Sequence, residues 1–155
     1  DLITGLLVMA VLGSGMGKLI IAIAITITPR FARIAYGPTL GLKEKEFVEA
    51  ARAVGQNNRV ILIKHILPNI GGELVVLASL WTASAIRLEA SLSFIGLGVP
   101  PPTATWGQMI REGTVYLSSL PLLSLAPGAA LLMTVFAFNL VGDGLRDVLD
   151  PRSRG

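Results

Sequence analysis

"EFVEAARAVGQNNRVILIKHILPN", residues 46–69, is a polar and basic stretch that lies between strongly apolar segments. Its first part has apolar residues at helical spacing and charged residues largely on the other side, and Gly55 stands where a helix would stop. After a polar turn, a second apolar run is followed by Pro68, which ends that run or bends it into the next segment. The stretch therefore predicts a helix, a turn and a second helix. The apolar positions of the first helix are Phe47, Ala50, Ala51 and Val54.

The composition of the whole chain is that of a membrane protein. Of its 155 residues, 52% are hydrophobic and 15% charged, and the mean hydropathy is +0.69, well outside the range of soluble domains. Three regions approach the about 20 apolar residues that cross a bilayer, namely 2–27, 74–99 and 115–141. We interpret "GSGMGK", residues 13–18, as a turn between two helices. The expected fold class is an all-α integral membrane protein, a transmembrane helix bundle.

The distribution of basic residues predicts the orientation of these segments. Seven of the 13 Lys and Arg residues lie between the first and second apolar regions, and three more follow the last. Cytoplasmic segments carry the excess of Lys and Arg, so both basic segments are expected in the cytoplasm. We predict membrane helices in 1–28, a cytoplasmic loop 30–69, a membrane helix 70–99, an external loop 100–114, a membrane helix 115–141 and a cytoplasmic tail 142–155. Nucleic-acid binding is not expected, because no basic surface with interleaved aromatic residues is visible.

The apolar stripe of the 46–69 stretch needs a cover. Lipid headgroups, the rest of the chain and a partner protein are the three candidates. Composition and spacing alone favour the first two over partner docking.

Particular residues of the sequence favour a partner protein as the cover of this stripe. "EAARAVG", nine further residues and "HILPN" closely resemble the cytoplasmic EAA loop of bacterial ABC importer permeases. "EASLSFIGLGVPPPTATWGQM" (89–109) and "FNLVGDGLRDVLDPR" (138–152) are similar to two further segments of the dipeptide, oligopeptide and nickel permeases, of the second permease subunit type. The resemblance covers the C-terminal half of such a permease, so we expect the sequence to be part of a longer subunit. The positions that match the EAA loop are Glu49, Ala50, Ala51, Gly55, Leu67 and Pro68, with His65 at the position usually held by Ile.

The resemblance implies a type I ABC importer permease fold, in which the helix-turn-helix loop docks on an ATPase. It also implies the partners: two ABC ATPase subunits that bind ATP and Mg²⁺, a homologous permease subunit in a heterodimer, an external substrate-binding protein and the lipid bilayer. The chain itself is then no enzyme, and ATP hydrolysis occurs on the separate ATPase. The expected location is a bacterial or archaeal cell membrane, the inner membrane in Gram-negative cells, with the C-terminus cytoplasmic. Peptides are the favoured substrate, with nickel or another small solute as alternatives.

The remaining polar residues are weaker candidates for a functional site. "GSGMGK" fails the phosphate-loop pattern, because Leu19 follows Lys18 where Ser or Thr is required. Arg87 and Glu89 fall within an apolar region, where ionisable residues are costly and default to a functional role. Two roles stay open for them: lining the pathway, or bonding to polar backbone near the outer leaflet. No metal site is expected, since His65 is the single histidine and transition-metal sites usually combine several ligands.

No residue pattern in the sequence supplies a nucleophile together with its base. The alternative to a transport subunit is therefore a non-transporting membrane scaffold that recruits a cytoplasmic ATPase through the same loop.

Overall fold

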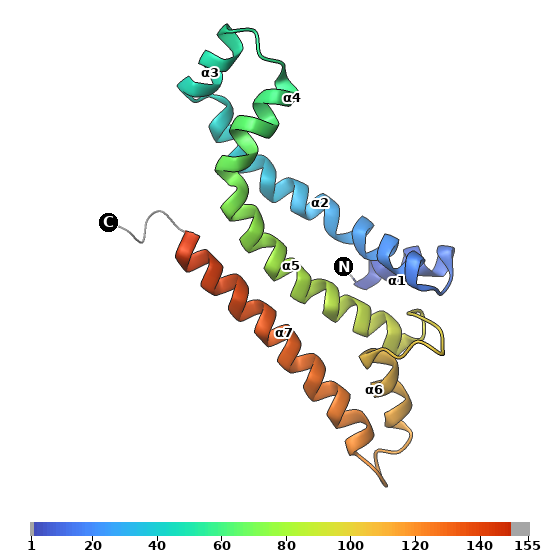
Figure 1. The fold of residues 1–155 in the computed structure, drawn as a ribbon. Helices are drawn as coiled ribbons and strands as arrows, with labels where there is room; N and C mark the ends of the chain where they lie inside the picture. Colours follow the sequence, from blue (N-terminus) through green and yellow to red (C-terminus); the bar gives the residue numbers. More distant parts are fainter. Residues whose placement is uncertain (1, 150–155) are drawn as a thin grey trace.

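A computed structural model describes residues 2–149 of the chain, and this part is built from helices (Figure 1). The range contains no β-strand, which confirms the all-α prediction. In chain order the elements are α1 (Leu2–Leu12), α2 (Met16–Lys43), α3 (Glu46–Ala53), α4 (Asn58–Ile61), the π-helical turn η1 (Leu62–Ile66), α5 (Leu67–Ile95), α6 (Trp106–Thr114) and α7 (Leu122–Leu149).

Within the described residues, three helical stretches are long and apolar enough to cross a membrane: α2, the continuous stretch Asn58–Ile95, and Leu122–Val148 within α7. Between 11% and 22% of their most apolar windows is buried inside the molecule. Most of their apolar side chains therefore face outward, as a lipid environment allows. Each of the three expected regions overlaps one of these stretches, and the shorter apolar helix α1 precedes them. Gly13 and Gly15, both with positive φ, lie in the turn between α1 and α2, as predicted.

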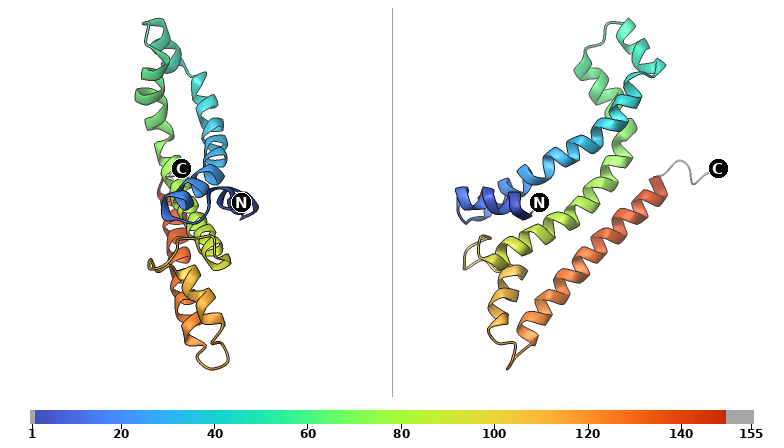
Figure 2. Two further views of the ribbon diagram at one scale, coloured as in Figure 1. Left: turned by 90° about the vertical axis from the view of Figure 1, so that its right-hand side faces the viewer. Right: turned by 180° about the vertical axis from the view of Figure 1, so that it is seen from behind.

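The long helices run side by side in alternating directions (Figures 1 and 2). α2 and α5 meet at the end of the molecule that carries α3 and α4, and α7 packs along α5. The short helix α6 packs against both α5 and α7 at the opposite end. We call these the hairpin end and the α6 end.

The helices near the hairpin end continue through their prolines. The loop was expected from residue 30, but α2 continues through Pro29 and Pro38 to Lys43. A proline inside a helix removes one backbone hydrogen bond, and membrane helices tolerate that loss. Of the two alternatives for Pro68, an end of the run is excluded, because the chain passes through the π-helical turn η1 and continues as α5.

The boundaries near the α6 end also differ. α5 stops at Ile95 because Gly96 adopts the left-handed conformation with φ 97°. The segment expected as an external loop, 100–114, contains α6, and the last long helix begins at Leu122 rather than at 115 and continues past 141. Of the predicted tail 142–155, residues 150–155 lie outside the described residues.

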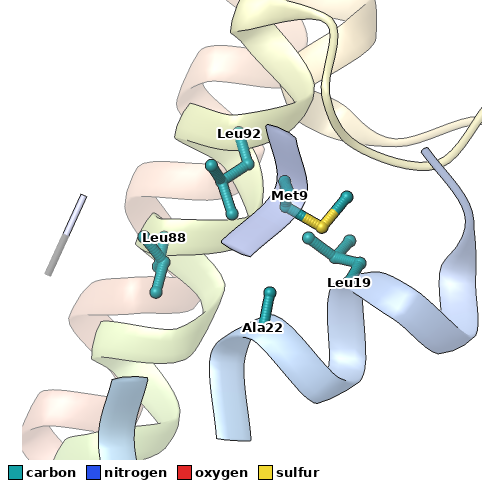
Figure 3. Close-up of a cluster of buried hydrophobic side chains, with 5 residues drawn as sticks. All are labelled: Met9, Leu19, Ala22, Leu88 and Leu92. Carbon is teal, nitrogen blue, oxygen red and sulfur yellow. The ribbon is translucent and has the colours of Figure 1, made fainter. Parts of the chain in front are cut away.

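Two clusters of buried apolar side chains hold the helices together. One joins α1, α2 and α5, where Met9 lies among the side chains of the neighbouring helices (Figure 3). The other lies inside the hairpin end. The first consists of Met9, Leu19, Ala22, Leu88 and Leu92, and the second of Val48, Ala51, Ile61, Ile66 and Ile70.

Glycines hold α6 directly against the backbone of its neighbours. A Cβ atom at Gly107 would lie 2.9 Å from the carbonyl carbon of Ala90 on α5, and one at Gly113 would lie 2.7 Å from the backbone nitrogen of Ser124 on α7. The Ser124 hydroxyl also donates a hydrogen bond of 2.7 Å to the carbonyl oxygen of Ile110. Helix α6 is therefore closely packed between α5 and α7.

Candidate functional site

The first leg of the hairpin ends at the predicted glycine. Gly55 has φ 80° and donates its N–H to the carbonyl of Arg52 at 2.9 Å. The N–H of Gln56 reaches back to the carbonyl of Ala51 at 3.1 Å. This pair of bonds is a Schellman motif, which requires a left-handed residue after the helix and favours glycine there.

The second leg is joined rigidly to a membrane helix. The Asn57 side chain caps α4 by accepting the backbone N–H of Arg59 at 3.3 Å. The Leu67 N–H bonds to the carbonyl of Leu62, five residues earlier, so the chain forms a π-helical turn just before Pro68. Single π-helical turns within α-helices are frequent at functional sites. The hairpin is therefore joined to α5 by one continuous helical path.

A side-chain contact connects the two legs. His65 Nε2 lies 3.0 Å from Gln56 Oε1, and the Asn69 side chain donates to the carbonyl of His65 at 2.7 Å. His65 is thus part of the hairpin's internal structure. Sequence reasoning missed its partner Gln56, because nothing in the polar "QNN" turn distinguishes one amide from the next.

The inner face of α3 is covered by the chain itself. Val48 is fully buried and Ala51 is 6% exposed, and both pack with Ile61, Ile66 and Ile70. Ala51 was predicted to belong to a surface stripe, and it instead faces this internal cluster. Self-packing, one of the three alternatives for covering the stripe, therefore accounts for this side of the helix.

The outer face of α3 remains exposed. Phe47 is 41% exposed and Val54 78% exposed, and Ala50 between them is exposed as well. The spacing 47, 50, 54 places the three on one side of a helix. Glu49 and Arg52, both exposed, lie on the same helix. Within residues 2–149 nothing buries this outer face, which is a small apolar surface with charges beside it.

The other residues of the matched loop are accessible. Gly55, Leu67 and Pro68 are exposed, and His65 is half-buried. A Cβ at Gly55 would meet no atom within 4 Å. The structure thus brings the matched positions together at one end of the molecule, with Ala51 alone turned inward.

Arg87 and Glu89 point to different partners. The Arg87 guanidinium donates to the Ser84 hydroxyl at 3.1 Å, whereas the Glu89 carboxylate accepts from the Ser93 hydroxyl at 2.6 Å. Arg87 is exposed and Glu89 half-buried. Two residues apart on a helix they do not neutralise each other, as their spacing predicts.

Comparison with known proteins identifies the family. Residues 2–155 match the model of the binding-protein-dependent transport system inner membrane component. The chain is similar to the glutathione transport system permease protein GsiD of Escherichia coli O1:K1 / APEC, of Escherichia coli O157:H7 and of Shigella sonnei (strain Ss046). In each case 47% of 148 residues are identical, over 96% of this chain and 49% of the relative. The chain therefore spans about half the length of the curated relatives it matches.

Proposed function

The chain belongs to the family of binding-protein-dependent transport system inner membrane components, and from this membership we propose that it serves in the transmembrane permease of an ATP-driven importer. Its three long apolar helices support the membrane role. The hairpin of α3 and α4 is the segment that docks on the ATPase. The one observation that carries this role is the uncovered outer face of α3, formed by Phe47, Ala50 and Val54.

The hairpin has the two physical properties that coupling needs. Its own cluster around Val48 keeps α3 fixed on α4, and the helical path from Asn58 to Ile95 connects it with the membrane segment. A nucleotide can shift the membrane helices only if the docked surface makes different contacts in the two states of the ATPase. A rigid hairpin converts those contacts into movement of α5.

The partners and the orientation belong to the same proposal. ATP and Mg²⁺ bind two ATPase subunits on the cytoplasmic side, where the basic hairpin end lies by the positive-inside rule. A homologous permease subunit completes the pathway, and an external binding protein delivers the solute. The C-terminus is cytoplasmic. The relatives are named for glutathione transport, which is consistent with a short peptide as the solute of this chain.

Cross-linking at the outer face of α3 tests the docking role. The chain contains no cysteine, so Ala50→Cys introduces a single thiol on the exposed side. In native membranes we expect a cross-linker to capture an ABC-type ATPase at this position. Ala126→Cys, exposed at the opposite end in the first turn of α7, is the matched control and is expected to capture none.

The outcomes separate the alternatives. Capture of lipid alone at Ala50→Cys would contradict the docking role. Capture of the ATPase in membranes that import no solute would favour the scaffold hypothesis instead.

A further inference from the structure

A groove of about 460 Å³ opens at the α6 end, between α2, α5 and α6. Its walls are mainly apolar and include Leu19, Ile23, Trp106 and Met109, and Glu89 is the one ionisable residue among those that line it. The volume falls in the range of about 300–1,000 Å³ typical of sites for small molecules, which combine apolar walls with a few polar groups. The groove thus has the composition of a ligand site.

The Glu89 carboxylate is incompletely satisfied by the described residues. The structure gives it one partner, the Ser93 hydroxyl at 2.6 Å, whereas an ionised carboxylate offers about four acceptor positions. Arg87, the nearest cation in sequence, bonds to Ser84. Glu89 lies six positions before the end of α5, about 9 Å along the helix axis. A carboxylate at such a position in a membrane helix calls for a cationic partner.

We propose that this groove binds a solute that carries a protonated primary amine beside an apolar side chain, with the amine on Glu89. The apolar part then contacts Leu19, Ile23 and Met109, and the Trp106 ring offers a second attractive surface for the cation. A short peptide with a free N-terminus has this chemistry. The assignment rests on the proposed import function for its biological meaning, but binding can be measured without transport.

The groove favours a solute over a basic side chain of a neighbouring subunit. A single basic side chain would satisfy Glu89 but leave much of a groove of about 460 Å³ unfilled. The apolar walls lower the effective dielectric constant beside Glu89, which strengthens a charge pair that forms there. A solute with an amine and an apolar side chain contacts both the Glu89 carboxylate and the apolar walls.

Protection of a thiol measures binding in the groove. Ala104→Cys places a single cysteine on the exposed part of the groove wall, in membranes that hold the chain in its natural complex. We expect leucyl-leucine to slow labelling by a charged maleimide, and N-acetyl-leucyl-leucine to have little effect. Ser119→Cys, exposed in the turn after α6 and absent from the groove lining, is the matched control and is expected to show no protection.

Removing the charge tests the role of Glu89. In the Ala104→Cys background, Glu89→Gln is expected to raise the half-protecting concentration of leucyl-leucine about tenfold. Glu73→Gln, an exposed glutamate on the same helix outside the groove, is expected to leave it unchanged. Both variants are compared at equal amounts of assembled complex.

Three results would overturn the assignment. Equal protection by both peptides would show an apolar pocket without amine recognition. Absence of protection in membranes that still import the dipeptide would place the solute elsewhere and leave the import function intact. Loss of a co-purifying permease subunit in Glu89→Gln, with protection unaltered, would show that the cation belongs to that subunit. Protection in membranes that do not import the dipeptide would support binding in the groove. It would contradict only the proposed import function.

Discussion

The two ends of α5 are built on different physical principles. At the hairpin end, α3 and α4 are held by a cluster of aliphatic side chains that they form with each other and with the start of α5. At the α6 end, two glycines bring α6 against the backbone of α5 and α7, with a hydrogen bond from Ser124. A hairpin that holds itself together can move as a unit, whereas a helix that packs on two neighbours follows them. Helix α5 therefore begins in a hairpin that packs on itself and ends against a helix that is fixed on two neighbours.

A bulky substitution at Gly55 gives the strongest test of the hairpin end. Gly55→Trp places a large side chain on the hairpin tip, which we expect to leave membrane insertion intact but to reduce uptake by at least about tenfold while ATP is still hydrolysed, a loss in the usual range of coupling energies. Uptake and ATP hydrolysis are measured together. Gly55→Ala places a Cβ on the same left-handed backbone without the bulk, and it is the control. Normal uptake in the Trp variant would remove the hairpin from the coupling path.

The fixed end is tested at Gly107. Gly107→Val forces a branched side chain against the backbone of Ala90, and we expect a loss of about 3 kcal/mol of stability, measured by thermal unfolding in detergent. Gly128→Val on α7, where a Cβ meets no atom within 4 Å, is expected to change stability by less than about 1 kcal/mol. Equal behaviour of the two variants would mean that α6 is not closely packed on α5.

Two valines of the hairpin separate its inner side from its outer side. Val48→Ala removes two methyl groups from a fully buried site, at a cost of about 2 kcal/mol. We expect faster amide hydrogen exchange in α3 and little change elsewhere. Val54→Ala makes the same substitution at a site that is 78% exposed and is expected to leave the exchange as it is. If both variants exchanged alike, the internal cluster would not be what holds α3.

The outer face alone is tested at Phe47. Phe47→Ala is expected to weaken ATPase capture about tenfold, as truncation of an aromatic anchor does, which corresponds to about 1.4 kcal/mol. Amide exchange of α3 should remain unchanged, because Phe47 is 41% exposed and lies outside the hairpin cluster. Phe136→Ala, 60% exposed on α7, serves as the control for capture. Faster exchange in the Phe47 variant would mean that the residue supports the hairpin instead.

Much of the fold could be predicted because its signals are local. The apolar length of each span, the turn at residues 13–18 and the helix stop at Gly55 depend on a few consecutive residues. The continuation of α2 through Pro29 and Pro38 to Lys43 and the start of α7 at Leu122 could not be predicted in the same way. A proline is a local signal for a break, but whether the helix breaks depends on its surroundings. The placements on the two sides of the membrane stay predictions.

The sequence by itself determined that this is a helical membrane protein, and its motifs determined the family, since apolar length and residue identity need no partner to be recognised. Only the tertiary structure decided that Ala51 turns inward while Ala50 remains outside, and that Glu89 lines a groove. These differences arise from contacts between segments far apart in the chain. The helical period limits which residues share a face, but the packing of α2, α4 and α6 selects the face that is covered.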